Sequence, residues 1–284
     1  MELMDLIQLS KICQNEEEAF TFLFNKKRQI SGLQCPNCGS EDFYKMHLKR
    51  LRCRICKRDY HPFSGTLLNE LRISYCAWLW LIKLFELEVS ARKASFQVNL
   101  SYPTTLKGFH TIRRGILYHV SQNDDLLKGE IEADKSYFGG KRNGKRGRGA
   151  GHKTIVFGIL ERGGKVTVSI VPNASAQALL NETVKKVRRG SIIYTDQWKG
   201  YDSLMFCGYK HLNINHQHKF KQGKVYINGV EGFWSFAKER LIKHHGISRE
   251  KFLFYIKEME WRYNHKEENL FDLIASYLLG AVSL

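Results

Sequence analysis

The sequence predicts an α/β protein: a mixed sheet with helices on both faces, preceded by a cysteine-rich unit and a helical segment. Four cysteines recur as two C-x2-C pairs, and residues 75–120 carry apolar side chains at helical spacing. From about residue 128, short apolar runs alternate with glycine-rich turns, which indicates strands. We therefore expect four parts: a helical segment at 1–30, a cysteine-rich unit at 31–66, a second helical segment at 67–122 and the sheet domain at 123–284.

The cysteine-rich unit has the ligand spacing of a zinc ribbon. Its two pairs are separated by 14 residues, and each pair fits a tight turn that aims two thiolates at one ion. Four thiolates suit tetrahedral Zn²⁺, whereas disulfides are unexpected in a reducing compartment. We expect one structural Zn²⁺ held by Cys35, Cys38, Cys53 and Cys56.

The segment 67–122 has the cadence of a helix-turn-helix, with small residues around Ala91 and a second helix starting near Ser101. The chain has a formal net charge of +17, and such an excess favours binding to polyanions. We expect Arg113 and Arg114 on the second helix to contact DNA phosphates or the groove. A plain helical connector is the alternative interpretation.

The sheet domain is predicted from its alternating and helical patterns. We expect strands at 131–138, 154–160, 165–171, 192–196 and 211–214, and helices at 175–188, 230–244 and 249–265. This order of elements resembles that of the ribonuclease H-like fold, a mixed sheet with helices on both faces.

Three acidic residues mark a candidate active site. Asp134 falls within the first strand and Asp196 at the end of the fourth, and adjacent central strands could bring them together. Glu231 follows on a helix that carries Lys238 on the same face. Three such carboxylates could hold two divalent cations for phosphodiester chemistry. Taken singly, each acid could instead be a strand-end, turn or helix-start residue.

A basic loop, residues 139–153, follows the first strand. Glycines let its backbone follow a curved phosphate chain, and its cations would neutralise that chain. The alternative is a disordered, solvated loop, and both interpretations hold if the loop becomes ordered on binding DNA. The side chains that we expect to bind DNA are Lys141, Arg142, Lys145, Arg146, Arg148 and Lys153.

The stretches 133–141, 195–201 and 228–238 resemble the signature blocks of DDE transposases of bacterial insertion sequences, in the group related to Merlin elements. The resemblance implies a zinc ribbon, a helical DNA-binding segment and a ribonuclease H-like catalytic core. It implies two Mg²⁺ (or Mn²⁺) ions held by Asp134, Asp196 and Glu231, with Lys238 on the DNA. Asn replaces the third acid in parts of this group, so Asn228 is a rival ligand.

The resemblance further implies a transposase that binds terminal inverted repeats and catalyses DNA cleavage and strand transfer, acting as a homodimer or higher assembly on element ends and target. Two alternatives remain: a ribonuclease H-like nuclease that does not join DNA, and a DNA-binding protein derived from a transposase. The N-terminus lacks the pattern of a secretory signal, and the longest apolar stretch, 75–87, is too short to span a bilayer. We expect a cytoplasmic protein with no membrane contact, associated with the nucleoid when bound to DNA.

Overall fold

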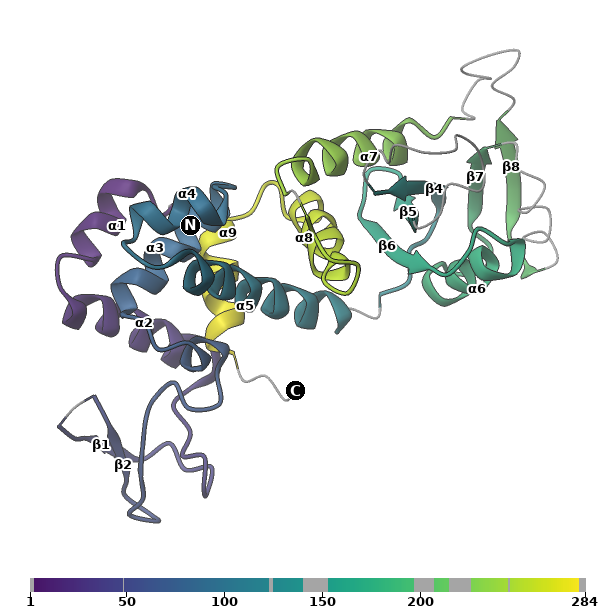
Figure 1. Ribbon diagram of the computed structural model, residues 1–284. Coiled ribbons are helices and arrows are strands. Elements are labelled where there is room, and N and C mark those ends of the chain that lie inside the picture. The colour runs from purple at the N-terminus through teal and green to yellow at the C-terminus, as the bar shows by residue number, and fades with distance from the viewer. Residues whose placement is uncertain are drawn as a thin grey trace. The chain divides into compact units, whose positions relative to one another are not determined.

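A computed structural model describes residues 3–47, 49–122, 125–139, 153–196, 207–214, 226–244 and 246–280. The chain divides into two compact units (Figure 1). We call residues 1–120 with 267–284 the helical unit, and residues 121–266 the sheet unit. The expectation that the whole of 123–284 forms one domain is therefore wrong at its C-terminal end, because residues from 267 onward pack with the helical unit.

The helical unit is built around an apolar helix. Its helices are α1 (Leu6–Ile12), α2 (Glu16–Ser31), the short 3-10 helix η1 (Leu67–Glu70), α3 (Tyr75–Glu86), α4 (Ala91–Gln97), α5 (Tyr102–Ser121) and α9 (Leu270–Leu279). Helix α3 begins at Ser74, whose side chain accepts a hydrogen bond from the Ala77 N–H. Its Trp78 and Leu79 are almost completely buried, which explains why this apolar stretch is a core helix. Within the described ranges, no helix is long and apolar enough to cross a membrane.

Helices α4 and α5 form the expected helix-turn-helix arrangement. A four-residue connection separates them, and Asn99 in it has a positive φ of 50°. Ala94 on α4 is fully buried. On α5, a Cβ at Gly108 would lie 2.8 Å from a methyl of Leu81, so α5 packs closely against α3 at this glycine. The sequence pattern indicated the buried small residue on α4 and the start of a second helix near Ser101.

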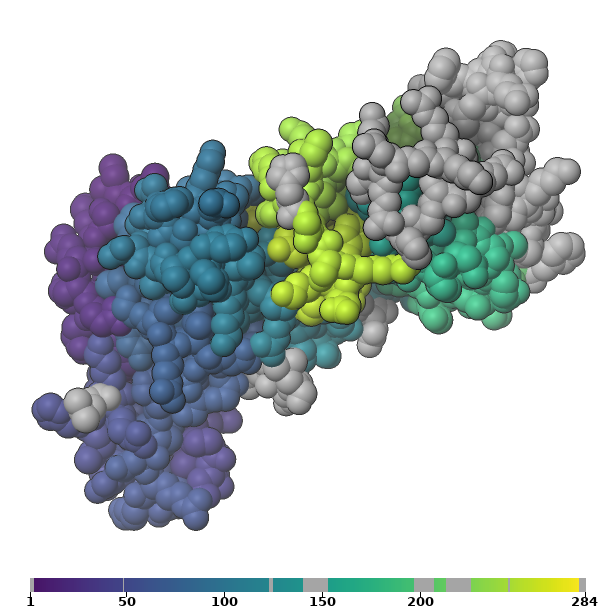
Figure 2. All heavy atoms as spheres, viewed as in Figure 1, coloured from purple at the N-terminus to yellow at the C-terminus, as the bar shows by residue number. Residues whose placement is uncertain are grey.

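The cysteine-rich unit is a three-stranded antiparallel sheet of order β1-β2-β3. Its strands are β1 (Phe43–Lys45), β2 (Leu51–Cys53) and β3 (Asp59–Tyr60). In Figures 1 and 2 this small sheet projects from the helices of its unit.

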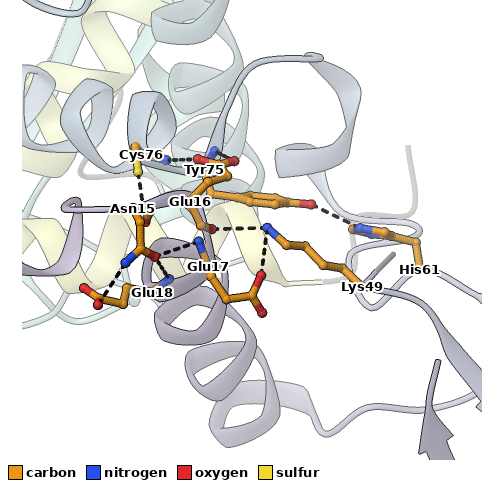
Figure 3. Close-up of polar contacts among 8 residues, drawn as sticks. All are labelled: Asn15, Glu16, Glu17, Glu18, Lys49, His61, Tyr75 and Cys76. Carbon is orange, nitrogen blue, oxygen red and sulfur yellow. Dashed lines mark hydrogen bonds and ion pairs between the residues drawn. The ribbon is translucent and has the colours of Figure 1, made fainter. Parts of the chain in front are cut away.

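Polar contacts join this small sheet to α2 and α3 (Figure 3). Lys49 donates from Nζ to the Glu16 carbonyl oxygen over 3.2 Å and lies 3.4 Å from a Glu17 carboxylate oxygen. The Glu16 carboxylate in turn accepts from the Tyr75 N–H at the start of α3, over 2.6 Å. The Tyr75 hydroxyl also lies 3.1 Å from His61 Nε2, so Lys49 and His61 both join the ribbon to the starts of α2 and α3.

The sheet unit contains a five-stranded mixed sheet of order β6-β5-β4-β7-β8. Its strands are β4 (Glu130–Phe138), β5 (Thr154–Glu161), β6 (Val166–Val171), β7 (Ile192–Asp196) and β8 (Lys210–Ile214). The first three strands pair antiparallel, whereas β4 with β7 and β7 with β8 are parallel. This order and direction confirm the predicted ribonuclease H-like fold.

Helices cover both faces of this sheet, as predicted (Figure 1). One apolar core lies under α6 (Ala176–Lys186) and includes Ile131 and Leu179. The other lies under α7 (Asn228–Leu241) and α8 (Phe252–Asn264) and includes Phe233. Successive strand residues point to opposite faces, so Ile131 and Ala133 of β4 join the core under α6, whereas Glu132 and Asp134 point toward α7. This alternation directs Glu132 and Asp134 toward the helix that carries Glu231.

Candidate active site and metal centre

The four cysteines of the ribbon form a compact group that could hold a metal ion. Their sulfur atoms all lie within 4.8 Å of one another. The N–H groups of Gly39 and Lys57 close the two turns by donating to the Cys35 and Cys53 carbonyls, over 2.9 and 3.1 Å. Both residues have positive φ, 72° and 59°, so each knuckle takes the same tight conformation. The site consists of Cys35, Cys38, Cys53 and Cys56, as the spacing predicted.

Backbone N–H groups of the ribbon lower the pKa of Cys53 and Cys56; the Ser40 backbone acts in the same direction on Cys38, but hydrogen bonding among the thiols raises the pKa of Cys38 to about 12. Hydrogen bonding to the Arg58 N–H is the largest influence that lowers the pKa of Cys56, to about 6. The Cys56 N–H acts in the same direction on the pKa of Cys53. Four sulfur donors at these separations fit Zn²⁺, which takes four thiolates in its structural sites.

Two candidate catalytic acids lie on neighbouring parallel strands. Glu132 on β4 pairs with Tyr194 on β7, and the same offset relates Asp134 to Asp196 two residues further along. Both aspartates consequently lie at one end of the paired region, on the face covered by α7. Lys135 contributes a cation there, with its Nζ 3.6 Å from Asp196 Oδ2.

Helix α7 completes the site. A cavity of about 410 Å³ opens between β4 and this helix. Helical spacing brings residues 231, 235 and 238 onto one face, as expected from their steps of four and three. The lining residues are Asp134, Lys135, Ser136, Tyr137, Glu231, Trp234, Ser235 and Lys238. Among the described residues Asp196 is not part of this lining, and it adjoins the site through Asp134 and Lys135.

The site is electrostatically strained without a cation. Burial is the main cause that raises the pKa of Asp134 from 3.8 to about 6, and the negative charge of Asp196 adds to it. Within the described part of the chain, Asp196 Oδ1 is buried and accepts no hydrogen bond. Carboxylate oxygens under these conditions fit hard divalent cations such as Mg²⁺. The three carboxylates are not gathered within 4.8 Å as the thiols are, judged over the described residues.

The structure also locates the rival ligand. Asn228 is the first residue of α7 and is exposed. It is not among the described residues that line the cavity, whereas Glu231 is. The placement therefore favours Glu231.

The expected DNA-binding residues differ in their surroundings. Arg113 is 3% exposed, and its guanidinium lies 5.1 Å from the centre of the Phe85 ring. The expectation that Arg113 reaches DNA is thus wrong, because its position on α5 faces the core. Arg114 forms an ion pair with Glu70, whose Oε2 lies 2.5 Å from Nη1. Lys153 is exposed. Outside the described residues lie Lys141, Arg142, Lys145, Arg146 and Arg148.

Trp234, which lines the cavity, and Glu132, which contacts the start of α7, did not stand out in the sequence. The Trp234 indole N–H donates to Asp134 Oδ2 over 3.0 Å. Glu132 is only 1% exposed and accepts from the Val230 N–H. The one available signal was its position two residues before Asp134, on the same face of the strand.

A zinc ribbon, a helix-turn-helix and a ribonuclease H-like sheet with carboxylates at its centre define a class of nucleic-acid-processing proteins. The description "ISXO2-like transposase domain" belongs to a family model that matches residues 126–264. An uncharacterized transposase-like protein of Haemophilus influenzae is 43% identical over 103 residues, which are 36% of this chain and 84% of that protein. The chain therefore belongs to the ISXO2-like transposase family.

More distant similarities extend over most of the chain. An uncharacterized protein in transposable element ISH50 of Halobacterium salinarum is 22% identical over 260 residues, covering 83% of this chain and 86% of that protein. The crystal structure of a pre-cleavage Mos1 transpososome matches with a TM-score of 0.30 and 11% identity, covering 69% of this chain and 76% of that one. A structural similarity at this level adds nothing to the strand order described above.

Proposed function

We propose that this transposase cuts DNA at the ends of an insertion sequence and joins the released end to a target, using the site between β4, β7 and α7. The observation that carries the proposal is the meeting of Asp134, Glu231 and Lys238 in one cavity, with Asp196 beside Asp134. Three carboxylates from two strands and a helix match the donor set of a two-cation phosphoryl-transfer site.

Asp134, Asp196 and Glu231 are the residues that would hold two Mg²⁺ or Mn²⁺ ions. Such ions supply Lewis-acid stabilisation of charge on the attacking and leaving oxygens of a phosphodiester. Lys238 extends its ammonium group from the same face of α7 and would contact a DNA phosphate. Catalysis at this site is positioning and electrostatics, with no covalent protein intermediate.

The helical unit is proposed to recognise the terminal inverted repeats. Its ribbon carries Arg52, Arg54 and Arg58, and backbone phosphates are the natural partners of such side chains. Helices α4 and α5 would place a helix in the groove. Pairing of two element ends before joining calls for two copies of the chain, so we propose a homodimer or higher assembly on DNA.

Asp196→Asn tests the proposal. The substitution keeps the size of the side chain and removes the charge that would bind a cation. Cleavage of a labelled element end and joining to target plasmid are both expected to fall by at least about 100-fold, roughly 2.7 kcal/mol of barrier. Binding of the uncut end, measured by gel shift, should stay near the wild-type value.

The outcomes separate the rival functions. Strand transfer by Asp196→Asn at the wild-type rate rejects the carboxylate assignment. Wild-type protein that cuts ends and never joins them is a nuclease, and protein that binds ends without cutting in Mg²⁺ or Mn²⁺ is a DNA-binding derivative.

A further inference from the structure

Helix α7 is attached to strand β4 at two points. The Val230 N–H donates to Glu132 Oε2, and the Trp234 indole N–H donates to Asp134 Oδ2, each over 3.0 Å. Two residues of a strand span about 6.6 Å, and four residues of a helix span about 6 Å. The two contacts therefore match in spacing and fix both the position of the helix along the strand and its rotation.

The first contact supplies a cap that the helix lacks. Ile227 stands at the N-cap position and offers no side-chain hydrogen bond, so the first amides of α7 need another acceptor. The buried carboxylate of Glu132 provides it from across the sheet. A Cβ at Gly229 would lie 2.9 Å from Glu132 Oε2 and 3.0 Å from a Leu160 methyl, so glycine allows this close approach.

Arg162 compensates the buried charge of Glu132. Its Nε donates to Glu132 Oε1 over 3.0 Å, and another nitrogen donates to the Tyr226 carbonyl oxygen over 2.6 Å. The guanidinium lies 3.8 and 3.9 Å from the ring centres of Tyr194 and Tyr226. Since Tyr226 lies two residues before the first residue of α7, this arginine holds the start of the helix as well as the acid that caps it.

The second contact reaches a candidate metal ligand directly. Asp134 pairs with Gly158 across β4 and β5. A Cβ at Gly158 would lie 2.6 Å from Trp234 Cζ2, so the absence of a side chain there lets the indole lie against β5 and meet Asp134. A hydrogen bond to a metal-ligating carboxylate fixes the orientation of that ligand.

We propose that Glu132 and Trp234 are positioning residues for the carboxylate site. They hold α7 so that Glu231, which follows Val230, and Lys238, one turn beyond Trp234, face Asp134 across the cavity. The inference rests on the proposed function, because it assigns these contacts to the placement of cation-binding carboxylates. Neither residue needs to touch DNA for this role.

Trp234→Phe tests the second contact. The change removes the indole N–H and keeps an aromatic ring. The matched control is Trp261→Phe on α8, a tryptophan that is 1% exposed and does not line the cavity. Isothermal titration of the full chain with Mn²⁺ alone should show binding at least about 10-fold weaker in Trp234→Phe than in the control. Excess Mg²⁺ should restore most of the DNA cleavage rate of Trp234→Phe.

Three results overturn the inference. One is Trp234→Phe binding Mn²⁺ as tightly as Trp261→Phe. Another is an equal loss in both variants, which would indicate a general effect of core packing. A third is wild-type protein that binds no Mn²⁺ and cuts no DNA, which overturns the proposed function as well. If the wild-type protein binds Mn²⁺ and cuts DNA, and Trp234→Phe binds Mn²⁺ equally well, only the positioning role is rejected and the proposed function stands.

Glu132→Gln tests the first contact, and the measurement is hydrogen–deuterium exchange of the Val230 backbone amide. Arg162 and Val230 donate to different oxygens of Glu132, and Gln replaces one of those oxygens by an NH₂ donor, so it cannot keep both contacts in this geometry. Hydrogen–deuterium exchange at Val230 should accelerate at least about 10-fold while the last turn of α7 keeps its protection. Mn²⁺ affinity should fall in parallel. Unchanged exchange at Val230, or faster exchange with unchanged Mn²⁺ affinity, would overturn the assignment.

Discussion

The carboxyl group of Asp134 lies against Trp234 and beside Asp196, and burial raises its pKa to about 6. The folded state without a cation therefore holds a proton more tightly than an unfolded aspartate with a pKa of 3.8 does. Protonation of Asp134 favours the folded state. Its ionisation therefore does not lower the free energy of unfolding below about pH 4, and lowers it progressively as the pH rises from there through about 6.

Because ionised Asp134 destabilises the folded state, we expect Asp134→Asn to stabilise the sheet unit in EDTA at pH 7.5, by on the order of 1–2 kcal/mol. The gain should shrink toward pH 4. Unfolding midpoints at a series of pH values measure it, with exposed Asp125→Asn as the control for a change of charge. A pH-independent difference would show that the ionisation of Asp134 is not its cause.

Substitutions of Glu231 and Asn228 distinguish which of the two residues is the third metal ligand. Glu231 lines the cavity and Asn228 is exposed at the start of α7. An anionic oxygen binds Mg²⁺ and neutralises it, whereas an amide oxygen does not neutralise charge. Glu231→Gln should abolish cleavage in Mg²⁺, and Asn228→Ala should leave a measurable fraction. If cleavage assays give the opposite ranking, Asn228 is the ligand.

At the level of elements, the ribbon is a small sheet that contacts helices α2 and α3. Its strands are only two or three residues long, so they bury little apolar surface. Its folding should therefore depend on the four thiolates, because metal binding supplies most of the free energy in such units. Lys49 and His61 would lose their contacts with α2 and α3 when the ribbon unfolds.

We expect about one zinc per chain by elemental analysis, and loss of that zinc in Cys38→Ser. Proteolysis should then cut the ribbon first and leave α7 and α8 intact. End binding should weaken with it. Cys207→Ser, at an isolated cysteine of the sheet unit, is the control and should keep its zinc. A wild-type preparation made without chelators and free of zinc would contradict this reading.

For the whole molecule, the chain leaves the helical unit near residue 120 and returns to it at 267. Helix α9 packs on α2 and α3 and buries Phe271, Ile274 and Leu278 completely. Lys26 pairs with Asp272, and Lys27 Nζ donates to the Leu279 carbonyl oxygen over 2.9 Å. The C-terminal segment therefore belongs to the proposed DNA-recognition part.

Ending the chain at Lys266 should destabilise the helical unit and spare the sheet unit. Each large apolar side chain that loses its partner costs about 1.5–3 kcal/mol, so the loss of three is comparable with the whole stability of a domain, about 5–15 kcal/mol. Limited proteolysis should cut within α2 and α3 of the truncated protein and leave a fragment near 121–266. Equal protease resistance of both units would show that α9 is dispensable.

Periodicity in the sequence was sufficient to place the strands and helices of the sheet unit, because alternation and helical spacing depend on local burial. Paired cysteine spacing likewise predicted the ribbon site, since both ligands of a pair lie in one turn. The three acids could be selected because each stands in its own local block. Lys238 followed from its position two turns after Glu231 on the same helix.

Contacts between residues far apart in the sequence could not be predicted, because they depend on tertiary packing and local periodicity does not specify it. Glu132 and Val230, or Asp134 and Trp234, are about one hundred residues apart and meet only when α7 lies on β4. Burial of Arg113 and the return of α9 to the helical unit are decided in the same way, by which faces find apolar partners. Local sequence determines which residues can share a face, and tertiary packing decides what that face touches.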